Sequence, residues 1–353
     1  MAIPPLLEAL LTTPGPSGHE RAAAEVWRSA ARDGGLDVSS DVMGSSVARA
    51  AGTGDGPRVA IVGHIDEIGL TVTHIGDDGM LWFASLGGWD PVNLVGQRVE
   101  VLTREGTVPG VVGKKPIHLM KPDERDKAPK LTDLHIDIGA KDGDEARGLV
   151  RQGDAAVIAA APVELPNGRV VSRALDNRLG CYVALEVARR VAEAGGAGGE
   201  VAAVAGVQEE TSMAGATTTA YSLRPDVAIT VDVTHATDAP GVDHKEIGKH
   251  ELGSGPVLAR GPVMHPAIFE LLHDTAEAES MPFTIETQGG RGSWTDADAF
   301  YLSRGGVATG LVSIPLRYMH SSVELVQLDD VEAAIRLLTA FAQRLPAELD
   351  LTR

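Results

Sequence analysis

An uncharged apolar run at residues 201–207 (VAAVAGV) stops abruptly at Gln208-Glu209-Glu210. Continuous apolar runs are typical of strands that are buried on both faces of a parallel sheet. Open α/β sheets carry their chemistry just beyond the carboxyl ends of such strands, where two adjacent carboxylates are costly to bury without a cation beside them. For a lone Glu-Glu pair, a solvated strand end is the more common explanation, because acidic side chains are usually exposed. The neighbouring strands decide between the two explanations.

Other apolar runs also end in polar residues. Strands are predicted at 58–63, before His64 and Asp66, at 226–233, which carries Asp232, and at 307–314, which leads to His320. Helices are predicted at 4–12, from a cap at Ser17 to about residue 32, and at 179–194, 266–280 and 331–345. This alternation predicts an α/β fold, a mostly parallel sheet with helices on both faces.

The sequence pattern of residues 71–162 differs from that of the α/β segments on either side. Short β-like runs at 80–83, 98–103, 107–112 and 155–160 alternate there with Gly, Pro and Asp turns, and no long helical period occurs. This pattern predicts a small β-barrel or β-sandwich inserted into the α/β domain, and the barrel is the form that we expect. The expected division is a catalytic domain made of residues 1–70 and 163–353, with an inserted domain at 71–162.

Charge and cysteine content indicate which binding partners and which cellular compartment to expect for this protein. The 353-residue chain has 31 Lys and Arg against 49 Asp and Glu, a net charge of −18, which argues against nucleic acid or an anionic membrane as partner. Its single cysteine, Cys181, excludes an intrachain disulfide and fits a reducing cytoplasm. No basic leader and no apolar stretch of membrane-spanning length are found, so we expect a cytoplasmic protein.

The polar groups at the predicted sheet edge form a metal-ligand set. Two imidazoles and several carboxylates suit zinc, cobalt or manganese, and they are too many for one tetrahedral ion with an open position. They suit two ions about 3.5–4 Å apart that share a carboxylate and a water. Glu209, the spare acid beside a ligand, is then the expected general base, and Asp66 is expected to accept the ring N–H of His64.

The same stretches resemble the M42 family of metallo-aminopeptidases, in the same order and over almost the whole chain. The matching residues are His64-Ile65-Asp66-Glu67-Ile68-Gly69, Ala174-Leu175-Asp176-Asn177-Arg178, Gln208-Glu209-Glu210, Val231-Asp232, Thr295-Asp296-Ala297, Ile314-Pro315 and Tyr318-Met319-His320-Ser321.

The resemblance implies a zinc-peptidase-like fold with a PDZ-like inserted barrel that drives self-association, up to a tetrahedral dodecamer. It also implies two divalent ions per subunit and cleavage of the N-terminal residue of short peptides. Each ion would have its own imidazole, Asp176 would bridge the ions, and one further acid would complete each shell; Glu209 would be the base. The implied metal ligands are His64, Asp176, Glu210, Asp232 and His320, and Asp296 is expected to contact substrate or support a ligand.

One departure from the family pattern and several alternatives stay open at this point. Ser212 and Ala214 replace the glycine and arginine that usually follow Gln-Glu-Glu. Their presence is the one feature in favour of a non-catalytic peptide-binding or assembly protein. A glycoside hydrolase that uses Glu209 and Glu210 is less favoured, because adjacent strand residues point to opposite faces. The sequence specifies neither the native metal nor the preferred N-terminal residue.

Local patterns add three expectations about helix starts. Ser17 with Glu20 is predicted to form a capping box, and Asp329 to cap the last helix. Asp176 could equally be the N-cap of the helix that follows it.

Overall fold

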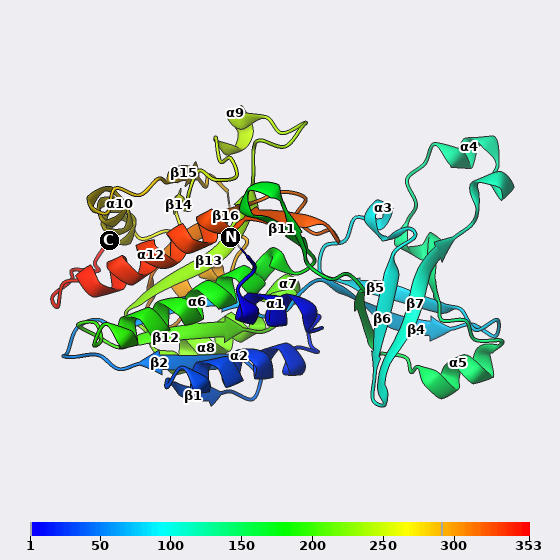
Figure 1. Ribbon diagram of the computed structural model, residues 1–353, viewed down its shortest axis with the longest axis horizontal. Coiled ribbons are helices and arrows are strands. Elements are labelled where there is room, and N and C mark those ends of the chain that lie inside the picture. Colours follow the sequence, from blue (N-terminus) through cyan, green and yellow to red (C-terminus); the bar gives the residue numbers. More distant parts are fainter. Residues whose placement is uncertain (1, 291) are drawn as a thin grey trace.

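The computed structural model describes residues 2–290 and 292–353, which form two bodies (Figure 1). The larger body is built on a mixed eight-stranded sheet. In spatial order its strands are β1 (Asp37–Ser40), β2 (Ser46–Ala50), β12 (Val201–Gly206), β3 (Val59–His64), β13 (Val227–His235), β16 (Ala308–Leu316), β14 (Val257–Arg260) and β15 (Thr284–Thr287).

The centre of this sheet is parallel, as predicted. Strands β12, β3, β13 and β16 run in the same direction, whereas β1, β2 and β14 pair with their inner neighbours in antiparallel fashion. Every residue of β3, β12 and β16 is buried, which explains why these strands appear in the sequence as unbroken apolar runs. The carboxyl ends of the central strands therefore share one edge.

Helices cover both faces of the sheet (Figure 1). The members of one layer are α1 (Pro5–Thr12), α2 (Arg21–Asp33), α6 (Leu175–Glu193), α10 (Pro266–Ala278) and α12 (Leu328–Arg344); those of the other are α8 (Ala214–Leu223) and α11 (Ala297–Tyr301). Alternate residues of β3 serve the two cores, because Ile61 packs with the α6 and α12 layer while Ala60 and Val62 pack with α8 and Phe300. The prediction of helices on both faces is confirmed.

The second body is a closed six-stranded barrel, on the right in Figure 1. Around the barrel its strands are β4 (Gly69–Ile75), β5 (Leu81–Leu86), β8 (Leu134–Asp137), β7 (Gly106–Lys114), β6 (Arg98–Thr103) and β9 (Ala155–Ile158). Its short helices are α3 (Pro91–Leu94), η1 (Ile117–Leu119), α4 (Pro122–Arg125), η2 (Leu131–Asp133) and α5 (Gly143–Leu149). Leu81, Val101 and Ile136 belong to a core of its own, so the inserted barrel is an independent packing unit.

A small antiparallel sheet lies between the start of α6 and the end of β16. Its strands are β10 (Val163–Leu165), β11 (Arg169–Ser172) and β17 (Glu324–Gln327). The remaining short elements are η3 (Pro166–Gly168), α7 (Glu209–Ser212) and α9 (His244–Ile247). Within the described ranges, no helix combines the length and apolar character needed to cross a bilayer.

The three helix-cap predictions are wrong. Helix α2 begins after Glu20 without a side-chain cap, because the Ser17 hydroxyl instead donates to Asp66 at 2.5 Å. Helix α12 begins at Leu328, one residue before Asp329. At the start of α6 the capping contact belongs to Asn177, whose Oδ1 accepts from the Gly180 amide at 2.8 Å, which leaves the Asp176 carboxylate free for other contacts.

Candidate metal centre

Five predicted ligands come from separate segments and meet at one edge of the central sheet. His64 is the last residue of β3, Asp232 lies in β13, and Glu210 lies in α7 directly after β12. His320 follows β16, and Asp176 stands at the start of α6. Asp176 follows β11 of the small sheet rather than a strand of the main sheet, so its arrival here depends on how α6 packs.

A glycine contact lets α6 lie directly on β3. A Cβ added to Gly63 would come within 2.3 Å of the Gly180 carbonyl carbon, so a side chain there would push the helix away. Asn177 fastens the same turn to β13, because its Nδ2 donates to the carbonyl oxygen of Val231 at 2.7 Å. These contacts bring Asp176 beside His64.

Asp176 lies at the centre of the cluster. Its Oδ1 is 3.2 Å from Nε2 of His64, and its Oδ2 is 3.3 Å from Nε2 of His320. Nε2 of His320 is also 3.4 Å from Oε2 of Glu210. One carboxylate thus presents each of its oxygens to a different imidazole, which is the arrangement required of a carboxylate that bridges two ions.

Two overlapping groups of side chains have ligand atoms within 4.8 Å of one another. One consists of His64, Asp176 and Glu210, and the other of His64, Glu209 and Asp232. Nitrogen and carboxylate oxygen donors in such groups suit zinc, cobalt and manganese. The residues therefore fit a pair of divalent ions. Glu209, which the sequence predicts to be a base, belongs to the second group, so its carboxylate also lies at ligand distance from His64 and Asp232.

The electrostatics of the cluster also favour a cation. Burial raises the pKa of Glu209 to about 10 and raises those of Glu210 and Asp232, and repulsion among the carboxylates adds to the effect. Burial alone would lower the pKa of His320, but Asp176 and Glu210 outweigh it and raise that pKa to about 11. Oε1 of Glu210 is buried without a hydrogen-bond partner among the described residues. Negative charge exceeds positive charge here, and divalent ions would offset the excess.

Asp66 contacts both His64 and the turn that follows β12. It is fully buried, and its Oδ1 lies 3.4 Å from Nδ1 of His64. Its two oxygens also accept from the backbone amides of Glu209 at 3.1 Å and Glu210 at 3.2 Å. The backbone carbonyl oxygen of Asp66 is 3.2 Å from the same Nδ1 of His64. Asp66 therefore orients the imidazole through both its carbonyl and its carboxylate, and the carboxylate also holds the turn that carries both glutamates.

The turn after β12 is not the strand end that the sequence predicts. Gln208 and Met213 have left-handed backbone conformations, with φ of 58° and 53°, and α7 is a single helical turn between them. Glu209 and Glu210 consequently line the same cavity. The argument against a glycosidase from opposite strand faces is therefore wrong, and the case against that function has to come from the metal chemistry.

Glu324 is a site residue that the sequence pattern did not single out. It is buried in β17, and its Oε2 accepts from the Asp176 amide at 3.1 Å while its Oε1 accepts from the His320 amide at 3.0 Å. Glu324 thus holds the backbone of two predicted ligands. A lone acid within the apolar stretch Val323-Glu324-Leu325-Val326 was the available signal, of the same kind as Asp232 in its strand.

Asp296 is also close to the cluster. It is 1% exposed, neither carboxylate oxygen has a hydrogen-bond partner in the described part of the chain, and burial raises its pKa to about 7. Cys181 is a fully buried core residue, and burial raises the pKa of its thiol to well above the usual range. A nucleophilic role for Cys181 is therefore not supported.

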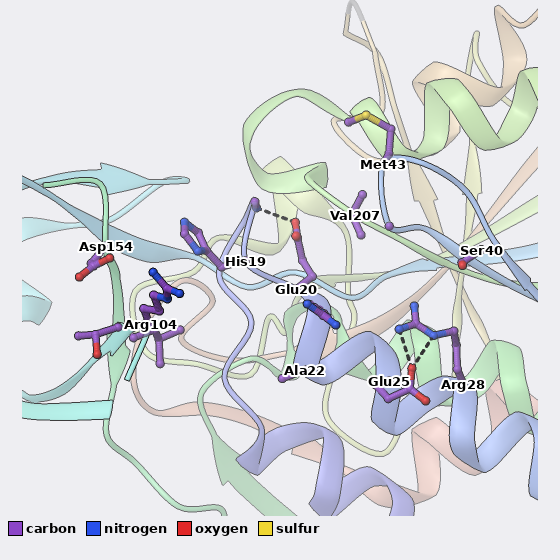
Figure 2. A pocket seen from close by; sticks show the side chains of 15 residues that line it. His19, Glu20, Ala22, Glu25, Arg28, Ser40, Met43, Arg104, Asp154 and Val207 are labelled. Atoms are coloured by element: carbon purple, nitrogen blue, oxygen red, sulfur yellow. Dashed lines mark hydrogen bonds and ion pairs between the residues drawn. The ribbon is translucent and has the colours of Figure 1, made fainter. Parts of the chain in front are cut away.

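A second cavity of about 880 Å³ lies between α2 and the barrel (Figure 2). Glu20 is in its wall and accepts from the Gly18 amide at 2.7 Å and the Gln208 amide at 3.2 Å. Arg104 and Asp154 lie on the barrel side of this cavity. Glu20 therefore connects the N-terminal loop to the residue that precedes Glu209.

Comparison with known proteins agrees with this geometry. Residues 44–337 match the family described as M42 glutamyl aminopeptidase. The chain belongs to the M42 peptidase family. It is 33% identical to a lysyl aminopeptidase of Pyrococcus furiosus, over 96% of each chain.

Solved structures give the same result. A TET aminopeptidase from the archaeon Thaumarchaeota archaeon SCGC AB-539-E09 superposes with a TM-score of 0.91 at 36% identity, over 96% of this chain and 95% of that one. The TET1 peptidase of Pyrococcus horikoshii, described as assembling into a tetrahedron or a large octahedral shell, gives 0.85 at 31% identity, over 96% and 99%. The chain is accordingly a metallo-aminopeptidase, and its Pyrococcus horikoshii relative self-associates.

Proposed function

We propose that this M42 protein is a dinuclear aminopeptidase that removes the N-terminal residue of short peptides with Glu209 as general base. The observation that carries the proposal is the position of Asp176, whose two oxygens face two different imidazoles. His64 and Asp232 would complete the shell of one ion, and His320 and Glu210 that of the other. Zinc, cobalt and manganese all accept this donor set.

When bound, the ions supply a polarised scissile carbonyl and a water of lowered pKa. The protein's own residues do the rest. Glu209 would take a proton from the attacking water and pass it to the leaving amine. Asp66, which accepts the Glu209 amide and lies beside Nδ1 of His64, would fix the tautomer of that imidazole. Burial favours the protonated form of Glu209, so this residue can act as a base only with positive charge beside it. Metal loading and base strength are therefore coupled.

The inserted barrel is the part of the chain that we assign to self-association. Ile117 and Leu119, two residues apart on its charge-rich loop, are exposed apolar side chains that a second copy of the chain could cover. We assign residues 71–162 to the inserted domain, whose first strand β4 already begins at Gly69. A tetrahedral dodecamer is the proposed assembly. A cytoplasmic location is the compartment that fits the lone, buried cysteine.

The decisive experiment compares Glu209→Gln with Glu193→Gln, which makes the same charge change at the exposed end of α6. We expect Glu209→Gln to retain both metal ions but to lose at least about 100-fold in kcat on aminoacyl chromogenic substrates, the lower end of a general-base contribution. Wild-type turnover by Glu209→Gln would refute the base assignment. Binding of peptides without cleavage by the metal-loaded wild type would instead identify a peptide-binding protein.

A further inference from the structure

The cavity above the metal ligands extends well beyond them. It measures about 640 Å³, and its walls beyond the ligands come from α7, the end of β13, strand β15 and the loop after β15. The residues available to contact a substrate side chain include Thr234, Glu286, Gln288, Trp294 and Met319. An N-terminal residue whose peptide bond lies at the ligands has to place its side chain against some of these walls.

The charged side chains described in this part of the cavity are acidic. Among the described residues that line it there is no lysine or arginine, and outside the candidate site residues Glu286 is the sole acid. Ser212, which stands beside Glu210 in the cavity wall, brings no cation either. The described residues of the wall therefore present one carboxylate, that of Glu286, to a basic side chain and no cationic side chain to an acidic one.

Strand geometry directs Glu286 toward the cavity. Along β15, Ile285 and Thr287 are exposed while Thr284 and Glu286 are half-buried, so Glu286 lies on the inward face. Gln288 follows two residues later and lines the same wall. Their shared face places two oxygen acceptors side by side along the cavity.

Neither acceptor has a hydrogen-bond or ion-pair partner among the described residues. Glu286 forms no ion pair with any residue in the described ranges, whereas other half-buried acids such as Glu186, Glu332 and Asp41 form an ion pair or accept a backbone amide. The Oε1 atom of Gln288 is buried and has no hydrogen-bond partner within the same ranges. A partly buried carboxylate and an unsatisfied amide oxygen on one wall are groups that a donor-rich cation would satisfy.

We propose that Glu286 and Gln288 select peptides with a basic N-terminal residue, lysine or arginine. The long aliphatic stem of such a side chain would lie along Met319 and Trp294, and its charged end would reach Glu286. An N-terminal Glu or Asp would meet repulsion at the same carboxylate. The inference rests on the proposed aminopeptidase function and adds its substrate class.

The test measures kcat/KM for Lys-, Arg-, Leu- and Glu-aminoacyl chromogenic substrates on the metal-loaded protein. The variants are Glu286→Gln, Glu286→Lys and Gln288→Leu, with Glu277→Gln on the exposed face of α10 as the matched charge control. We expect the wild type to prefer Lys and Arg over Glu by at least about 100-fold, and Glu286→Gln to lose about ten-fold on Lys and Arg alone. Glu286→Lys should gain activity on the Glu substrate, and Glu277→Gln should match the wild type.

Several results would overturn the inference while leaving the aminopeptidase function intact. One is a wild type that cleaves Leu or Glu substrates faster than Lys and Arg. Another is a Glu286→Gln variant that loses activity equally on all four substrates, since the Leu substrate reports correct folding and an intact metal centre. Failure to cleave any of the four substrates with both ions bound would instead refute the proposed function itself.

Discussion

Glu324→Gln tests how the protein holds its metal ligands without touching a ligand side chain. Each oxygen of Glu324 accepts one backbone amide, from Asp176 at 3.1 Å and from His320 at 3.0 Å. Glutamine keeps the shape but replaces one oxygen with an NH₂ group, which would face an amide N–H donor. A hydrogen bond to a charged group contributes about 1.5–3 kcal/mol, and here that loss falls on the two residues placed to serve both ions.

The expected size follows from that range. At about 1.4 kcal/mol per ten-fold, the loss corresponds to roughly 10- to 100-fold weaker binding of the ion held by His320, within the range known for residues that support ligands. Burial beside Asp176 also raises the pKa of Glu324 well above its usual value, so its ionised form depends on nearby positive charge. Metal affinity should be measured by calorimetric titration of the metal-stripped protein, with kcat and Tm followed in parallel.

Asp330→Asn is the matched control. Asp330 is also a buried carboxylate that accepts two backbone amides, from Gly253 at 2.7 Å and Gly255 at 2.8 Å, but it does not contact the metal residues. Both variants should lower Tm, and Glu324→Gln alone should weaken metal binding. Unchanged affinity in Glu324→Gln, or an equal loss in Asp330→Asn, would refute the reasoning.

Two further predictions concern proton and metal binding. Burial raises the pKa of Glu20 from 4.5 to about 7, so its protonated form stabilises the folded state below pH 4.5, and that stabilisation is lost as pH rises through 7. The free energy of unfolding of the wild type, measured in urea, should therefore fall relative to that of Glu20→Gln by up to about 3 kcal/mol as the pH rises from 4.5 to 8. A difference between the two proteins that does not change with pH would contradict this. EDTA should abolish activity and lower Tm, and zinc, cobalt or manganese should restore both; a glycosidase without metal would be indifferent to the chelator.

The sequence was informative where burial on both faces left a visible pattern. The unbroken apolar runs of β3, β12, β13 and β16 identify the central strands, and a charge that interrupts or ends such a run, as at Asp232, has to be compensated. Because the carboxyl ends of parallel strands share an edge, the convergence of His64, Glu210 and Asp232 could be expected from the order of apolar runs and polar ends along the chain.

Other features could not be predicted because they depend on contacts between distant segments. The carboxylate of Glu324 holds an amide 148 positions away, at Asp176, and Ser17 reaches Asp66 across 49 positions. The local sequence pattern predicted helix caps wrongly at Ser17, Asp176 and Asp329. A serine or aspartate side chain that can cap a helix can also hydrogen-bond to a buried group elsewhere in the chain. The left-handed Gln208 and Met213, which place both glutamates in one cavity, carry no glycine to signal the turn.

Anomalous diffraction from crystals grown with zinc tests most directly whether Asp176 bridges two divalent ions. The account predicts two anomalous peaks about 3.5–4 Å apart on either side of the Asp176 carboxylate, one beside His64 and Asp232 and the other beside His320 and Glu210. A single peak, or peaks bound to other residues, would contradict it.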